Sequence, residues 1–150
     1  MPTKITRKLK LKRRLKKEFS SKRKYKTTYK DIKTYFRMFN AALFESKLSP
    51  FGQIQIKDLA REKCIGQVVT LEWKRKGTRL FKLEMLPSYP NKKDFLDTLV
   101  HEMVHLYQMQ NLGDSGTHND LFWSFEGKVN SVGLTPVSYT HLTLPTIREV

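Results

Sequence analysis

The chain has 150 residues, of which 39% are hydrophobic and 11% aromatic, so it is long enough to bury one core and too short for two large domains. Its formal net charge of +15 is concentrated at the N-terminus, because residues 1–30 contain 14 of the 29 Lys and Arg residues and a single acidic residue, Glu18. The remaining 15 basic and 13 acidic residues leave the body nearly neutral, which predicts a basic arm attached to an almost uncharged domain.

The expected cellular location follows from the cysteine content and from the lack of long apolar runs. One cysteine, Cys64, cannot form an internal disulfide, and a reducing compartment suits it. No apolar run reaches the roughly 18 residues of a membrane span, and the cationic N-terminus lacks the apolar stretch of a secretion signal. We therefore expect an intracellular monomer without a membrane partner, located in the cytoplasm, the nucleoid or the nucleus.

The first predicted segment, residues 1–27, is a basic arm that we expect to be disordered in water, since its like charges repel and few apolar groups can be buried. Its apolar residues recur at near-helical spacing, so it could become helical on a polyanion. Its cations predict affinity for nucleic acid, with DNA as the expected partner. The candidate contacts are Lys8, Lys10, Lys12, Arg13, Arg14, Lys16, Lys17, Lys22, Arg23 and Lys24. The alternatives are a solvated tail and an arm that binds membrane or ribosomal RNA.

Globular patterning begins at Thr28, which precedes Asp31 by three residues, as an N-cap precedes an acidic first turn. A core-facing helix is predicted from there to about Ser46, because the apolar residues follow i, i+3, i+4, i+7 spacing. Pro50 and Gly52 then predict a turn.

Three segments of alternating apolar residues follow this turn. They cover residues 53–58, 64–73 and 80–86, and Gly77 supplies a turn between the last two. A three-stranded antiparallel sheet is the most economical arrangement of these segments.

A second long helix is predicted from Asn91, an N-cap residue with Asp94 three positions later, to Gly113, which suits the end of a helix. Its apolar residues cover a wide arc, so we expect it to be mostly buried. A shorter helix over residues 120–133 completes the fold.

These elements define one α+β domain over residues 28–133. Residues 134–150 have no helical period and contain two prolines. We interpret them as a non-native or unstructured tail and exclude them from the fold.

The segment TLVHEMVHLYQ, residues 98–108, carries the pattern H-E-x-x-H within the second long helix. Residues four apart lie on one side of a helix, so His101 and His105 can direct both imidazoles at one metal ion. Glu102 lies about 100° around the helix, where its carboxylate can act on a metal-bound water without binding the metal. The pattern predicts zinc-dependent hydrolysis with Glu102 as the general base. Histidines that are merely hydrogen-bonded are the alternative.

A catalytic zinc usually has three protein ligands, so this helix requires a partner from elsewhere in the chain. His118 lies 13 residues after His105, beyond a loop with two glycines, and Glu126 lies 21 residues after His105 on the following helix. We prefer His118 as the third ligand, because three of the four histidines would then converge on one ion. Glu126 remains the alternative.

Three segments together resemble the SprT-like (Spartan-type) zinc metallopeptidase domain. They are FRMFNAALFESKLSPF before the sheet, LVHEMVHLYQ on the helix and GTHNDLFWSF after it, and the resemblance covers about residues 29–133. It implies a minimal zincin-like domain with an N-terminal helix, a sheet, an active-site helix and a C-terminal helix. It also implies Zn²⁺ held by His101, His105 and His118, and catalysis by Glu102.

The same resemblance implies proteolysis near DNA, including cleavage of proteins crosslinked to it in DNA repair. Two features depart from the family: Asn119 replaces the usual glycine after the third histidine, and a C-terminal zinc ribbon would need more cysteines than Cys64. We infer that the basic arm substitutes for the missing DNA-binding module.

The leading hypothesis is therefore a zinc metalloendopeptidase that cleaves protein substrates held near DNA. The alternative is a non-catalytic nucleic-acid-binding protein whose zinc site is structural. Glu102 favours the enzyme, because a purely structural site does not need this carboxylate.

Overall fold

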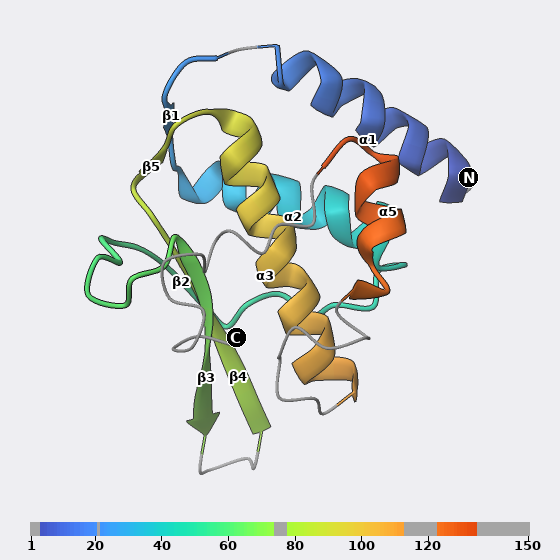
Figure 1. The fold of residues 1–150 in the computed structure, drawn as a ribbon. Helices are drawn as coiled ribbons and strands as arrows, with labels where there is room; N and C mark the ends of the chain where they lie inside the picture. Colours follow the sequence, from blue (N-terminus) through green and yellow to red (C-terminus); the bar gives the residue numbers. More distant parts are fainter. Residues whose placement is uncertain (1–3, 21, 74–77, 113–122, 135–150) are drawn as a thin grey trace.

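The structure, a computed structural model, describes residues 4–20, 22–73, 78–112 and 123–134. Its helices are α1 (Lys4–Glu18), α2 (Tyr29–Leu43), α3 (Lys92–Leu112) and α5 (Glu126–Ser131). Its strands are β1 (Tyr25–Lys26), β2 (Gln53–Ile56), β3 (Gly66–Trp73), β4 (Thr78–Met85) and β5 (Ser88–Tyr89). Helix α3 contacts strand β3 and helix α2, and α1 in turn packs on α2 (Figure 1). The predicted α+β class is confirmed.

Helix α2 begins where the sequence predicts. The Thr28 side chain accepts a hydrogen bond of 3.1 Å from the backbone N–H of Asp31, which satisfies one of the free donors of the first turn. The apolar face of the helix is buried as its spacing predicts, through Ile32, Tyr35, Phe36, Phe39, Ala42 and Leu43. The helix ends at Leu43, three residues before the predicted end, because the backbone turns to positive φ at Glu45 and Ser46.

The three-stranded sheet is mixed, with the order β2-β4-β3. Strand β3 pairs antiparallel with β4, whereas β2 pairs parallel with it, so the predicted strands are confirmed but the all-antiparallel arrangement is wrong. Strand β4, whose Phe81, Leu83 and Met85 are buried, takes the centre. Strands β2 and β3 therefore lie on its two sides instead of beside each other. Alternation identifies a strand and its buried face, but it does not identify the neighbour.

Helix α3 is the most buried element of the fold. The backbone N–H of Asp94 donates to Asn91 Oδ1 at 2.9 Å, which confirms the predicted N-cap. Every residue from 95 to 106 is buried, because strand β3 covers one side and helix α2 another. The C-terminal helix was predicted over residues 120–133, but in the described part of that range only Glu126–Ser131 forms the helix α5, which follows a turn at Ser124 and Phe125.

Helix α1 differs from the disordered arm that the sequence predicts. The structure describes a helix whose Leu11 and Leu15 are 2% and 0% exposed and belong to the main core. The segment after it is also paired, since Tyr25 in β1 lies opposite Tyr89 in β5 and its ring stacks on Phe95 at 4.4 Å. Charge composition predicts solvation of this segment, whereas Leu11 and Leu15, four residues apart, bury one face of the helix in the core.

The end of the described chain also belongs to the core. Leu134 is 2% exposed, and its backbone N–H donates to the carbonyl of Val129 at 3.2 Å. The predicted tail from residue 135 onward lies outside the described residues. In the described part of the chain, no helix is long and apolar enough to cross a membrane.

Candidate metal centre on helix α3

The H-E-x-x-H residues lie inside the protein. His101, Glu102 and His105 are 2%, 0% and 0% exposed, and the two histidines lie about one helical turn apart on α3. Burying two imidazoles and a carboxylate in an apolar helix is costly unless specific interactions compensate for lost hydration. Such a cluster is therefore typical of a functional site rather than of a packing core.

The two imidazoles converge on one point. His101 Nε2 and His105 Nε2 are 3.1 Å apart, and the rings meet edge to face at an interplanar angle of 78°. Two nitrogens bound to one tetrahedral zinc, each about 2.0–2.1 Å from it, are roughly 3.3 Å apart. The observed separation is thus close to that of two ligands of a single metal ion, and the residues present fit the metal that the sequence predicts.

Gln108 orients His105, and its role was missed at the sequence level. Its side-chain oxygen lies 2.9 Å from His105 Nδ1 and is itself buried with the histidine. An oxygen acceptor at Nδ1 places the ring proton there and leaves Nε2 with the lone pair that a metal needs. From the sequence we assigned no role to Gln108. Its position, one turn after a candidate ligand, was the available signal.

The Glu102 carboxylate lies beside the imidazole pair. Its Oε2 is 3.9 Å from His101 Nε2, too far for a direct hydrogen bond. This places the carboxylate next to the point where the imidazoles converge, as a general base requires.

Strand β3 covers this part of α3 at close range through Gly66. A Cβ atom at this position would lie 2.6 Å from Thr98 Cγ2 and 3.7 Å from Glu102 Cγ. Only glycine permits this approach without displacing a neighbour, so the strand lies close to α3 beside Thr98 and Glu102.

Tyr89 in β5 joins the segment before β3 to the segment between β4 and β5. Tyr89 is 2% exposed, and its hydroxyl donates to the carbonyl of Ile65 and accepts from the backbone N–H of Leu86. Burial raises the pKa of this phenol, and the nearby Glu102 carboxylate raises it further, so Tyr89 stays neutral.

The third ligand is not settled by the described residues. His118 lies outside them, and the side chain of Glu126 is not described. Among the described residues, no group of three His, Cys, Asp or Glu side chains is arranged to hold a metal. The chain leaves α3 at Leu112 and is back against it at Phe125, whose ring packs edge-on against Tyr107 at 5.2 Å.

The ten predicted nucleic-acid contacts lie in two places. Seven are on α1, namely Lys8, Lys10, Lys12, Arg13, Arg14, Lys16 and Lys17. The other three, Lys22, Arg23 and Lys24, are exposed in the segment between α1 and β1.

Comparisons with known proteins add no relative: no family model, no curated protein and no solved structure matches the chain. Function is therefore inferred from the residues and their geometry.

Proposed function

We propose that the protein is a zinc-dependent metallopeptidase of the SprT-like type that cleaves proteins bound or crosslinked to DNA. The observation that carries this proposal is the pair of buried imidazoles whose Nε2 atoms approach to 3.1 Å on one face of α3. The hydrogen-bonding contact between His105 and Gln108 supports it, because metal-binding histidines characteristically use their second ring nitrogen in this way.

His101 and His105 would hold the zinc together with His118, or with Glu126 as the alternative. Zinc bound there supplies Lewis acidity and a water whose pKa falls to about 7. Glu102 would take a proton from the water as its oxygen attacks the peptide carbonyl carbon. Glu102 would then deliver that proton to the leaving nitrogen as the carbon–nitrogen bond breaks, which leaves a carboxylic acid and an amine.

The competing function is a structural zinc site in a nucleic-acid-binding protein. Two features favour catalysis over this alternative. A buried carboxylate beside the imidazole pair has a role in hydrolysis and none in a purely structural site. Cys64 is the only cysteine of the chain, so a closed thiolate-rich site is excluded.

DNA as the location of the substrate is supported by the family resemblance and by the cationic surface of α1. Most cations of this helix, including Lys10, Lys12, Arg13, Lys16 and Lys17, are exposed and carry the charge that phosphate neutralisation requires. This part of the proposal is independent of the peptidase chemistry on α3.

The experiment that tests the enzyme is cleavage of a DNA-bound protein by the full chain. Cleavage should be lost on chelation and restored by zinc. Glu102→Gln should lower the rate by about 10²–10⁴ while zinc content stays unchanged. Glu45→Gln, the same substitution on an exposed residue, should leave the rate unaltered. Retained activity in Glu102→Gln would exclude the mechanism, and unfolding on zinc removal with a silent Glu102→Gln would favour the structural site.

A second measurement decides the third ligand. Zinc per chain is compared between His118→Ala and Glu126→Ala, each purified without added metal. Loss of zinc in His118→Ala alone is the expected result. Loss in Glu126→Ala alone would transfer the role to that residue.

A further inference from the structure

The outward face of α1 carries a cluster of exposed cations. Leu11 and Leu15 define the inward face, and at about 100° per residue the opposite side spans an arc of roughly 160°. That arc carries Lys10, Lys12, Arg13, Lys16 and Lys17, all exposed. These five cations extend over roughly 10 Å of the helix axis at 1.5 Å per residue.

No acidic residue balances these cations. In the described part of the chain, none of the five forms an ion pair, and the only acid of α1, Glu18, faces inward. Lys12 and Lys16, and likewise Arg13 and Lys17, are four residues apart and repel each other in the free protein. A helix that is docked by leucines and keeps such repulsion on its open face is typical of a binding surface, where local rules for stability are broken.

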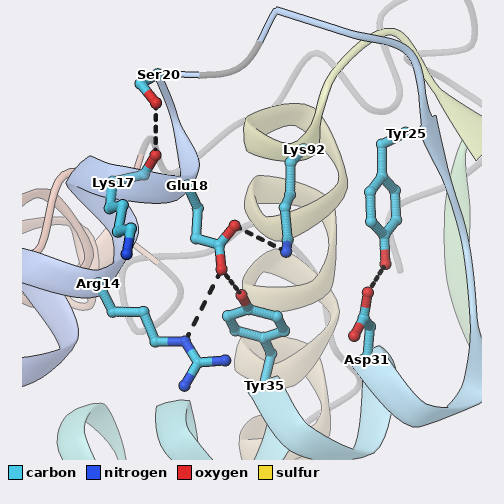
Figure 2. Close-up of polar contacts among 8 residues, drawn as sticks. All are labelled: Arg14, Lys17, Glu18, Ser20, Tyr25, Asp31, Tyr35 and Lys92. Carbon is cyan, nitrogen blue, oxygen red and sulfur yellow. Dashed lines mark hydrogen bonds and ion pairs between the residues drawn. The ribbon is translucent and has the colours of Figure 1, made fainter.

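Glu18 joins this helix to two others (Figure 2). Its carboxylate accepts hydrogen bonds from Tyr35 Oη at 2.8 Å and Lys92 Nζ at 2.9 Å, and Arg14 Nε lies 3.9 Å away. The Lys92 ammonium also lies 5.1 Å from the centre of the Tyr35 ring. We call Arg14, Glu18, Tyr35 and Lys92 the Glu18 cluster.

The Glu18 cluster includes a residue of α3, because Lys92 is the first residue of that helix. Burial by itself would raise the pKa of Glu18, but the hydrogen bonds from Lys92 and Tyr35 hold it below its ordinary value. The carboxylate is therefore ionised at neutral pH, and the ion pair fixes α1 relative to the start of α3.

We propose that the outward face of α1 is a preformed binding site for the two phosphate backbones of duplex DNA. The Glu18 cluster holds this face in a fixed position relative to α3. The inference rests on the DNA association in the proposed function and is independent of the peptidase activity. In this proposal α1 is a rigid surface and not a flexible arm, so bound DNA keeps a fixed position relative to the candidate metal centre on α3.

Duplex DNA fits this surface better than the other polyanions do. Cations spread over a wide arc can contact phosphates on both sides of a helix that lies along the major groove, which is about 12 Å wide. The major groove of duplex RNA is too narrow and deep for that approach. An anionic membrane requires an apolar face that can insert, whereas among the α1 side chains that the structure describes on this side, Leu9 is the only exposed apolar one.

The test compares two triple variants that each remove three positive charges. Lys12→Ala/Arg13→Ala/Lys16→Ala alters the outward face, and Lys22→Ala/Arg23→Ala/Lys24→Ala alters the exposed segment after the helix. The readout is the Kd for a 20-base-pair duplex at several salt concentrations. The face variant should lose at least tenfold in affinity, and its slope of log K against log salt should fall by about 2–3, at about 0.9 per lost phosphate contact. The segment variant should lose less than threefold.

Equal losses in both variants would overturn the fixed surface, because they would show that only total charge matters. Tighter binding of duplex RNA, or of phosphatidylcholine vesicles containing phosphatidylserine, would overturn the assignment to DNA. Circular dichroism and zinc content verify that both variants fold. If the protein is a peptidase but the outward-face variant binds DNA like wild type, the inference about α1 alone is refuted. If the two variants bind as expected but the protein has no peptidase activity, only the catalytic proposal is refuted.

Glu18→Gln tests the cluster, because two explanations predict opposite signs. The substitution removes a negative charge, so electrostatics alone should tighten DNA binding. Loss of the ion pair with Lys92 frees α1 to move, and preorganisation therefore predicts weaker binding by about threefold or more. An unchanged or lower Kd would overturn the role of the cluster.

Discussion

Helices α3 and α1 place their functional polar residues in opposite environments, the protein interior in α3 and the solvent-exposed surface in α1. In α3 the imidazoles and a carboxylate are buried among apolar side chains, whereas most of the α1 cations that the structure describes are exposed and only Leu11 and Leu15 are buried among its described side chains. Each arrangement costs stability, through desolvation in α3 and through repulsion in α1. The comparison teaches that function can be sought wherever a helix departs from the pattern that best stabilises it.

The largest effect expected on this comparison concerns the docking of α1. Leu15→Ala should lower the free energy of unfolding by about 2–5 kcal/mol, because Leu15 is 0% exposed and its removal leaves a cavity. Leu9→Ala, the same substitution on the same helix at a residue 48% exposed, should change it by about 0.5 kcal/mol or less. Urea unfolding measures both. Equal, negligible effects would mean that α1 is a detached arm and would break the comparison.

The next effect concerns the tight packing around α3. Gly66→Ala should cost about 1–3 kcal/mol, since the added methyl would meet Thr98 at 2.6 Å. Gly127→Ala in α5, where an added Cβ has no neighbour within 4 Å, should instead stabilise by up to about 1 kcal/mol. Thermal unfolding of the two variants should therefore shift in opposite directions. A shift of the same sign in both would contradict the close approach of β3 to α3.

A smaller change is expected from the residue that orients His105. Gln108→Ala should weaken zinc affinity by about 10–100-fold, because the imidazole loses the oxygen that fixes its tautomer. Gln110→Ala serves as the control, since the Gln110 side chain bonds only to the backbone of Ser49 among the contacts described. Competition with a chromophoric chelator gives both affinities. Equal affinities in the two variants would remove Gln108 from the site.

The smallest effect is the pH dependence of the Glu18 cluster. The pKa of Glu18 is lowered in the folded protein, so its contribution to stability is present above the ordinary value of 4.5 and is lost as pH falls through the folded pKa. The difference in unfolding free energy between wild type and Glu18→Gln should therefore be constant near neutrality and shrink below about pH 4.5. A difference that grows on acidification would reverse the sign of the proposed interaction.

Much of the fold could be predicted from local patterns. The caps at Thr28 and Asn91, the apolar face of α2 and the three strand segments follow from spacing within a few residues, and the structure places them there. The neighbours of β2 could not be predicted, because pairing depends on contacts across the sheet that alternation does not encode.

The candidate site shows the same division. His101, Glu102 and His105 could be predicted because all three lie within five residues of one helix, where spacing fixes direction. Gln108 was missed since its role appears only when its oxygen is seen beside Nδ1. The docking of α1 was missed because 14 cations dominate the composition of residues 1–30, whereas burial of Leu11 and Leu15 depends on packing against the next helix, α2, which composition does not encode.

The central claim is that α3 binds a catalytic metal through its two imidazoles, and zinc titration of the metal-free protein tests it most directly. Wild type should bind one zinc per chain, His105→Ala should bind none, and His141→Ala, which alters the fourth histidine of the sequence, should bind like wild type. Equal zinc binding by wild type and His105→Ala, or none by either, would contradict the account.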